Sequence, residues 1–292
     1  MAKNSRLKMP GPPEEYTPEQ ALELLKCIQD PVYFIETYCK ITHPTRGMVG
    51  FKLYDFQREL VDSFHNNRST IVCASRQVGK SQTSCGFLLW YACFNSHKEI
   101  LIISNKAKSA KDMVKRIVFM YENLPDWIKP AINPNNWNKL EIEFANKNRI
   151  VSESTTEQSG RGMSVSLLFA DEFAFVEPSI AEEFWTSISP TLSTGGSCII
   201  ASTPNGDDNK FAELWRGANL NNNGFIPFFV QWDTVPGRDE SFKQQEIGKV
   251  GLQKWEQEYE CLRGDSLVEV LINDNEIVKI PIKDLYEMLQ RN

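Results

Sequence analysis

Glycine, lysine and serine stand side by side in the stretch ASRQVGKS, residues 74–81, between a strand-like run, STIVCAS, and a long apolar run with helical character. At such a strand-to-helix turn, Gly79 lets the backbone amides turn towards phosphates, Lys80 reaches the β/γ oxygens, and the Ser81 hydroxyl binds Mg²⁺. The pattern GxxxxGK[ST] is imperfect because Ala74 replaces its first glycine, and a surface turn that carries a lysine is the alternative. The order strand, loop, helix favours a phosphate-binding loop.

Two adjacent acids end a second apolar run, LLFADEF, residues 167–173. In a phosphate-loop ATPase the aspartate at this place, here Asp171, holds Mg²⁺ through water, and the following acid, Glu172, orients the attacking water. An Asp-Glu pair can also do no more than cap a helix. A buried strand that delivers both acids after a Gly-Lys-Ser loop is more specific than either feature alone, and together they predict ATP hydrolysis.

A third apolar run, SCIIAS, ends in STPNG, residues 202–206. Polar groups at the end of a strand beside a nucleotide could sense its γ-phosphate. Pro-Asn-Gly is equally a common turn, so the spacing alone leaves both interpretations open.

The elements that must position these groups follow one another in a regular order. Helices are expected from Thr17, from Asp30 and over residues 53–64, with a loop over 43–50. Strands are expected over residues 69–75, 99–105, 139–146, 149–154, 166–172 and 197–202, the first two each followed by a helix. Strands that alternate with helices predict an α/β fold whose mainly parallel central sheet is covered on both faces.

Composition limits the classes of protein to which this chain can belong. Hydrophobic residues make up 41% and charged residues 24% of the 292 residues, and no apolar run approaches membrane-spanning length. The first residues lack the apolar core of a signal peptide, so a cytosolic protein is expected. Seven cysteines without framework spacing predict reduced thiols, and three scattered histidines disfavour a structural zinc site. The net charge of −6 predicts that any contact with DNA is local.

The motifs SRQVGKS, LLFADEF and ASTPNG, in this order, resemble the ATPase domain of the large terminase subunit of tailed bacteriophages. That family carries a deviant phosphate loop with an arginine, which Arg76 matches and which accounts for Ala74. LYDFQREL resembles its adenine-recognising element, and VYFIETYCKIT (32–42) and WTSISPTLSTGG (185–196) resemble further parts. The resemblance covers residues 15–260 and implies a phosphate-loop ATPase that uses ATP and Mg²⁺ to drive viral DNA into a capsid.

The resemblance also implies roles for individual residues. Nucleotide binding would fall to Gln57, in the adenine-reading position, and to Ser75, Arg76, Gln77, Val78, Gly79, Lys80 and Ser81. The metal would be held by Ser81 and Asp171, catalysis would rest on Glu172 and Arg76, and coupling of hydrolysis to movement on Ser202, Thr203 and Asn205. Arg161 is a possible arginine acting on a neighbouring subunit, with a surface salt bridge as the alternative.

The partners expected of such a motor are double-stranded DNA, the terminase small subunit, the portal protein and further copies of the chain in a homo-oligomeric ring, with no membrane. The expected location is the host cytoplasm, with transient docking on the procapsid and no secretion. Two other functions stay open: a helicase-like ATPase, for which nothing after STPNG supplies a second motor domain, and a nucleotide-binding assembly module.

Cys261 begins a second pattern, because CLRGDSLVEV resembles the start of an intein. A strand over 266–272, a turn over 273–275, a strand over 276–282 and a helix over 284–290 match its first, β-rich segment. The Cys261 thiol would attack the carbonyl of Glu260 and form a thioester. No TxxH block or terminal His-Asn follows, so the resemblance implies the N-terminal half of a split intein. A complementary chain would carry the C-terminal intein piece and the nuclease domain, joined by trans-splicing.

The alternatives for Cys261 are a packed thiol in a final hairpin and a longer gene cut short. With the split intein, four parts of the chain are expected: residues 1–50 as the N-terminal helical segment of a lid subdomain, 51–206 as the ATPase core, 207–260 as lid and linker, and 261–292 as the intein segment. The small helical lid is thus expected to be discontinuous in sequence.

Overall fold

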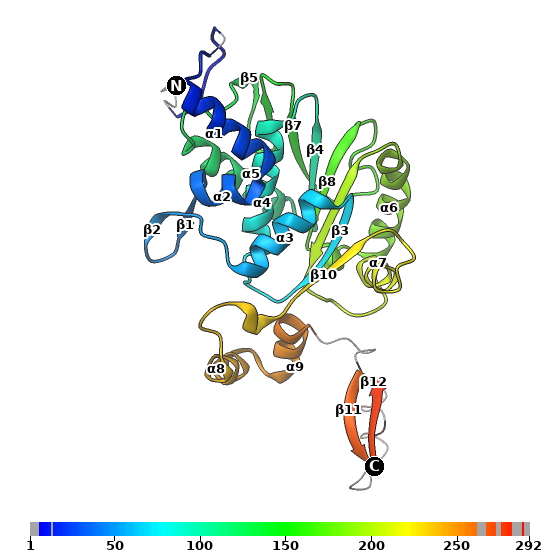
Figure 1. The fold of residues 1–292 in the computed structure, drawn as a ribbon. Coiled ribbons are helices and arrows are strands. Elements are labelled where there is room, and N and C mark those ends of the chain that lie inside the picture. The colour runs from blue at the N-terminus through cyan, green and yellow to red at the C-terminus, as the bar shows by residue number, and fades with distance from the viewer. Residues whose placement is uncertain (1–5, 13, 262–266, 273–275, 282–287, 289–292) are drawn as a thin grey trace.

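An eight-stranded sheet runs through the centre of the molecule in the order β10-β3-β9-β8-β4-β7-β6-β5 (Figure 1). The computed structural model describes residues 6–12, 14–261, 267–272, 276–281 and 288. The strands of the sheet are β3 (Ser69–Ala74), β4 (Glu99–Ser104), β5 (Ile132–Trp137), β6 (Glu141–Phe144), β7 (Arg149–Ser154), β8 (Val165–Asp171), β9 (Ser197–Ser202) and β10 (Ile226–Val230). Neighbours from β10 to β7 pair in parallel, whereas β6 pairs antiparallel with both β7 and β5. This confirms the predicted α/β fold with a mainly parallel sheet.

Strand β5 is an addition that the sequence does not predict, because its Asn-Pro-Asn-Asn is typical of a turn. The strand lies at the edge of the sheet, where a proline is tolerated since no ladder hydrogen bond is lost. It pairs with β6 irregularly, from Ile132 opposite Phe144 to Trp137 opposite Ile142.

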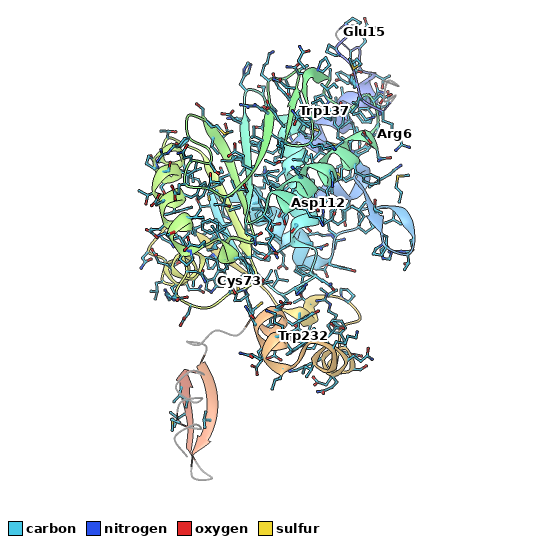
Figure 2. All side chains as sticks on the ribbon, turned by 180° about the vertical axis from the view of Figure 1, so that it is seen from behind. Arg6, Glu15, Cys73, Asp112, Trp137 and Trp232 are labelled. Carbon is cyan, nitrogen blue, oxygen red and sulfur yellow. The ribbon has the colours of Figure 1, made fainter. Side chains whose placement is uncertain are left out.

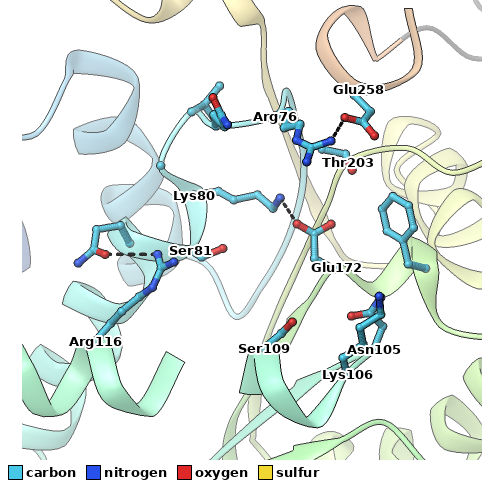
Figure 3. A pocket seen from close by; sticks show the side chains of 15 residues that line it. Arg76, Lys80, Ser81, Asn105, Lys106, Ser109, Arg116, Glu172, Thr203 and Glu258 are labelled. Carbon is cyan, nitrogen blue, oxygen red and sulfur yellow. Dashed lines mark hydrogen bonds and ion pairs between the residues drawn. The ribbon is translucent and has the colours of Figure 1, made fainter. Parts of the chain in front are cut away.

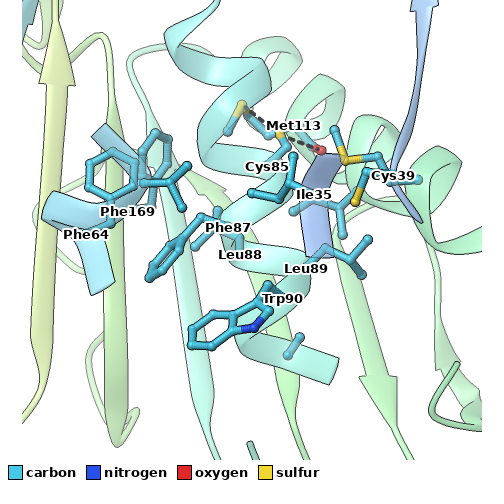
Figure 4. Close-up of a cluster of buried hydrophobic side chains, with 14 of the residues drawn as sticks. Ile35, Cys39, Phe64, Cys85, Phe87, Leu88, Leu89, Trp90, Met113 and Phe169 are labelled. Carbon is cyan, nitrogen blue, oxygen red and sulfur yellow. Dashed lines mark hydrogen bonds between the residues drawn. The ribbon is translucent and has the colours of Figure 1, made fainter. Parts of the chain in front are cut away.

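Helices cover both faces of the sheet (Figure 1). One face carries α3 (Asp55–Asn66), α4 (Lys80–Phe94) and α5 (Ala107–Glu122), and the other carries α6 (Pro178–Ser193) and α7 (Lys210–Asn219). Side chains alternate along each strand, so that in β3 Val72 belongs to the first core and Ile71 to the second. Figure 4 shows part of the first core, where Phe87 of α4 packs on Phe64 of α3 with ring centroids 5.5 Å apart. Because both faces are covered, the strands are continuous apolar runs.

Two short helices and a hairpin precede α3. They are α1 (Pro18–Gln29), α2 (Pro31–Tyr38), β1 (Lys40–His43) and β2 (Gly47–Gly50). The predicted helix starts are confirmed, since Thr17 and Gln20 form a capping box and the Asp30 side chain caps α2. The loop predicted over 43–50 is wrong, because β1 and β2 pair antiparallel and Gly47, with a φ of 69°, closes the turn between them.

Residues 207–260 are divided between the sheet and a separate lobe. α7 packs under the sheet, and β10 extends it, with the buried Val230 opposite Ala74 of β3. The C-terminal lobe, residues 232–260, consists of η2 (Trp232–Thr234), α8 (Glu240–Val250), α9 (Leu252–Trp255) and the π-helical turn η3 (Glu256–Glu260). α2 packs on α3 and α4, away from this lobe (Figure 1). Within residues 207–260, β10 therefore belongs to the central sheet and not to the lid and linker expected from sequence, because it pairs with β3, a strand far away in the chain.

Aromatic rings form the core of the C-terminal lobe. Trp255 stacks on Tyr259 with centroids 4.5 Å apart, and Trp232 and Phe242 meet Trp255 edge-on at 5.2 and 6.1 Å. In Figure 2, Trp232 lies in the lobe and Cys73 lies near the end of β3, where sheet and lobe meet. The lobe is thus a packed unit seated at the end of the sheet from which the Gly-Lys-Ser loop emerges.

The last strands, β11 (Leu267–Ile272) and β12 (Glu276–Pro281), pair antiparallel as a hairpin. They confirm the two strands predicted here, whereas the predicted turn over 273–275 and helix over 284–290 lie outside the described residues. Across the part of the chain that the structure describes, no helix has both the length and the apolar character needed to cross a membrane.

Candidate nucleotide site

A cavity of about 540 Å³ lies where β3, β4, β8 and β9 end (Figure 3). The carboxyl ends of parallel strands meet at this edge, which is where open α/β sheets bind ligands. The cavity is lined by Arg76, Gln77, Val78, Gly79, Lys80, Ser81, Gln82, Asn105, Lys106, Ser109, Arg116, Glu172, Phe175, Thr203 and Glu258. Three sets of residues that the sequence predicts separately, the phosphate loop, the acidic pair and the end of β9, therefore contribute to one cavity.

The Gly-Lys-Ser loop is held closely from behind by α3. Gly79 precedes α4 with a φ of 85°, a conformation that favours glycine, and a Cβ atom there would lie 2.6 Å from the Gln57 Nε2 atom and displace this side chain. Gln57 Nε2 donates to the Val78 carbonyl at 3.0 Å, and Gln57 Oε1 accepts from the Tyr54 amide at 3.0 Å. Gln57, predicted to read adenine, thus holds the loop in this structure.

The acidic pair faces the loop across the cavity. Lys80 Nζ lies 2.6 Å from Glu172 Oε1, and Ser81 Oγ lies 3.1 Å from Asp171 Oδ2 (Figure 3 shows the first contact). Glu172 has a φ of 54°, a left-handed conformation, and its amide donates to the Ala201 carbonyl at 2.8 Å. Such a conformation costs an ordinary residue free energy, and it turns the Glu172 side chain out of the strand direction into the cavity.

Ser81 and Asp171 fit a Mg²⁺ ion. A hydroxyl and a carboxylate are the hard oxygen donors that this ion prefers, and two protein donors suffice where phosphate oxygens and water complete the shell. Asp171 is buried, and this burial raises its pKa to about 6, so a cation beside it would relieve the cost of a buried charge. Among the residues described, no cluster of three or more His, Cys, Asp or Glu side chains offers another metal cage.

Arg76 is bound by the C-terminal lobe. Its guanidinium forms an ion pair with the Glu258 carboxylate, and its amide donates to the Glu258 carbonyl at 2.7 Å (Figure 3). Burial acts to raise the pKa of Glu258, but hydrogen bonds from Arg76 and Lys254 outweigh it and lower this pKa. The arginine predicted to stabilise phosphate charge is therefore neutralised here by a residue that sequence analysis did not single out.

The end of β9 connects the acidic pair to the same lobe. η1 (Phe173–Phe175) follows the acidic pair, and within it the Ala174 amide donates to Ser202 Oγ at 3.1 Å. Asn205 Nδ2 donates to the Ala174 carbonyl at 3.2 Å, while Asn205 Oδ1 accepts from Gln257 Nε2 at 3.1 Å. Asn205 therefore links η1 to the lobe through two hydrogen bonds.

Ser75 and Cys261 lie beneath the loop. Ser75 is fully buried, and its hydroxyl donates to the Tyr259 carbonyl and lies 3.7 Å from Cys261 Sγ. Cys261 is 5% exposed, and its backbone is left-handed with a φ of 56°. Hydrogen bonding with the Cys73 thiol lowers the pKa of Cys261, although burial acts the other way.

Arg161 is not among the residues that line the cavity, and its Nε atom donates to Ser187 Oγ of α6 at 3.3 Å. Sequence analysis in turn missed several residues that do line it: Asn105, Lys106, Ser109 and Arg116 from the end of β4 and from α5, and Glu258 from the lobe. The signal for the first group was present, because Asn105 and Lys106 directly follow a predicted parallel strand. Glu258 gave no such signal.

A phosphate-type loop and a strand-end acidic pair at the carboxyl edge of a parallel sheet define the class of phosphate-loop α/β proteins. Within that class, the chain belongs to the family described as terminase large subunit, T4likevirus-type, N-terminal, whose model matches residues 71–277. The matched range includes β11, so it marks no boundary at Cys261.

Solved structures show the same fold. The large terminase ATPase domain of Thermus phage P74-26 is 21% identical with a TM-score of 0.59, over 73% of this chain and 94% of that chain. The large terminase of bacteriophage HK97 is 15% identical with a TM-score of 0.67, over 84% of this chain and 57% of that one. A large terminase from a thermophilic bacteriophage in complex with ADP is 12% identical with a TM-score of 0.58, over 72% and 53%. The chain thus matches little more than half the length of the two latter proteins.

Proposed function

We propose that this chain binds ATP with Mg²⁺ and hydrolyses it, as the ATP-hydrolysing part of a large terminase subunit that drives double-stranded DNA into a capsid. The observation that carries the proposal is the meeting of Lys80 and Ser81 with Glu172 and Asp171 across one cavity. Membership of the terminase family and the likeness to a terminase solved with ADP support it.

Nucleotide binding would replace contacts between side chains of the cavity by contacts with phosphate, and the chemistry follows from this replacement. Lys80 leaves Glu172 for the β/γ-phosphate oxygens, because these carry more negative charge than one carboxylate. Glu172, once released, accepts a hydrogen bond from a water molecule and orients it towards the γ-phosphorus. Ser81 and Asp171 would hold Mg²⁺, which would neutralise part of the phosphate charge when bound. Once its ion pair with Glu258 is broken, Arg76 can direct its positive charge to the phosphates from within the loop.

Family membership supports the other partners that we propose: the terminase small subunit, the portal protein and a homo-oligomeric ring of this chain. The corresponding location is the host cytoplasm, with transient docking on a procapsid. In such a ring Arg161 is proposed to act on a neighbouring subunit, since it lies outside the cavity of its own chain, in the turn before β8, where its side chain reaches Ser187 of α6.

The test is release of phosphate from ATP by the full chain, with and without double-stranded DNA, beside the variant Asp171→Asn. Turnover that requires Mg²⁺ and falls in the variant supports the proposal. ATP binding without hydrolysis under any condition, with DNA and portal present, favours an assembly module instead. Strand separation of a short duplex would favour a helicase.

We also propose a second function, trans-splicing that begins at Cys261. The β11–β12 hairpin, whose first strand begins at Leu267, supports it, since an intein is expected to begin with paired strands. In the first step Cys261 Sγ bonds to the carbonyl carbon of Glu260, the bond to the Cys261 nitrogen breaks, and the thiol proton passes to that amine. Mixing the full chain with one that carries the remaining intein and the nuclease domain should give a ligated product. Absence of any ligated or cleaved product would contradict splicing.

A further inference from the structure

Arg238, in the loop between η2 and α8, reaches out of the C-terminal lobe to the back of the phosphate loop. Its Nη2 atom donates to the Gln77 carbonyl at 2.9 Å and its Nη1 atom to the Arg76 carbonyl at 3.2 Å. Arg238 does not line the cavity, so these carbonyls are held on the side away from the nucleotide. One planar guanidinium thus binds two consecutive peptide groups.

This contact fixes the direction of loop amides. In a trans peptide the N–H points opposite to the C=O, so holding the Arg76 and Gln77 carbonyls outward turns the amides of Gln77 and Val78 inward. Gln57 does the same for the next peptide by binding the Val78 carbonyl, which turns the Gly79 amide inward. Three successive amides then face the cavity, as a phosphate requires.

The loop needs such support. Gln77 has a φ of 58°, a left-handed conformation that is unfavourable for a residue with a side chain. Arg238 is itself held in place, because its guanidinium lies 5.0 Å from the ring centre of Phe242 and Nη1 also approaches the Trp232 carbonyl at 3.5 Å. Both rings belong to the aromatic core of the lobe.

From this geometry we infer that Arg238 is a positioning residue for ATP hydrolysis, one that couples the C-terminal lobe to the phosphate-binding amides. With the lobe seated, the loop amides point at the β- and γ-phosphates, and with the lobe displaced they lose that alignment. The inference rests on the proposed nucleotide function. It means that the position of the lobe controls the affinity of the loop for nucleotide.

The experiment compares Arg238→Gln and Arg238→Lys with the wild type and with Lys249→Gln. Lys249 lies on α8 of the same lobe and pairs with Glu246, so its loss removes one charge without touching the loop. Two quantities are measured on the full chain: hydrogen exchange of residues 75–82 without nucleotide, and ADP affinity with Mg²⁺. Melting temperature reports whether each variant folds.

Arg238→Gln is expected to speed exchange across 75–82 and to weaken ADP binding about tenfold, since one charge-assisted hydrogen bond is worth about that factor. Arg238→Lys keeps the charge but cannot bind two carbonyls in a fork, so about a threefold loss is expected, with intermediate exchange. Lys249→Gln should match the wild type in both measurements.

Unchanged exchange and unchanged ADP affinity in a folded Arg238→Gln chain would overturn the inference. If that variant fails to fold, Arg238→Lys decides, and wild-type values in both measurements would overturn it equally. Failure of the wild type to bind ADP would instead overturn the proposed function, while exchange, measured without nucleotide, would still report the contact between Arg238 and the loop.

Discussion

Replacing Glu172 by glutamine should separate ATP binding from ATP hydrolysis. The substitution keeps the size of the side chain and a hydrogen-bond acceptor for Lys80, but it removes the negative charge that lies 2.6 Å from the Lys80 ammonium. A glutamine amide is also far weaker than a carboxylate at accepting a proton from water. Turnover should therefore fall by about 10²–10⁴-fold, the range for loss of a general base.

Binding should change in the opposite direction. The Glu172 side chain is 31% exposed, so its ion pair with Lys80 is worth about 1 kcal/mol or less. ATP must break this pair to recruit Lys80, and without it ATP binding should be tighter by up to about fivefold. Asp171 and Ser81 remain, so dependence on Mg²⁺ should persist.

The assay has two parts: single-turnover hydrolysis, and equilibrium titration with ATP under conditions where hydrolysis is negligible. Glu183→Gln, a substitution of an exposed glutamate on α6, is the matched control and should behave as the wild type. If Glu172→Gln loses ATP binding in proportion to turnover, or hydrolyses ATP at the wild-type rate, the role given to Glu172 is wrong.

Three further predictions concern the surroundings of the loop. Glu258→Gln weakens the ion pair with Arg76 and should lower the free energy of unfolding by about 1 kcal/mol at pH 7. The pKa of Glu258 is lowered from 4.5, so the stabilisation by its ion pair is complete above that pH and is lost as the pH falls below it. The difference in unfolding free energy between wild type and variant should therefore be smaller at pH 4 than at pH 7, as denaturation measures. An equal difference at both pH values would contradict this role of Glu258. Gln57→Ala leaves the Val78 carbonyl without its donor and should weaken ADP binding in a titration, whereas a change confined to adenine specificity would favour the adenine-reading role. Cys261→Ala should abolish both ligation with the complementary chain and thiol-induced cleavage, while ADP binding persists. It should also lower the free energy of unfolding by about 1 kcal/mol, because a buried side chain becomes smaller. Ligation that survives the substitution would exclude Cys261 as the nucleophile.

Much of the sheet could be predicted because its signals are local. The β-branched run before the loop and the apolar run before Asp171 each fix a buried strand, and parallel pairing brings their ends together. Because Lys80 follows one of these strands and Glu172 follows the other, parallel pairing is enough to predict that the two residues lie at the same edge of the sheet. The helix starts at Thr17 and Asp30 were also predictable, since a cap depends on residues within one turn.

What the sequence could not reveal depends on contacts between distant segments. Arg238 and Glu258 meet the loop across separations of 161 and 182 residues, and their own neighbourhoods look like ordinary polar helix and loop. The same is true of β10, which joins the sheet beside β3. Its short run IPFFV pairs with a strand far away in the chain, and the sequence alone places it in the lid and linker expected over 207–260.

Titration of the full chain with ATP, with and without Mg²⁺, for the wild type and Lys80→Ala tests the central claim most directly. The Lys80 ammonium is the cation that the structure directs into the cavity from the first turn of α4. The account predicts Mg²⁺-dependent binding by the wild type and a loss of at least about tenfold in Lys80→Ala with unchanged melting, since a charged hydrogen bond to phosphate is removed. Equal ATP affinity in a folded Lys80→Ala chain would contradict it.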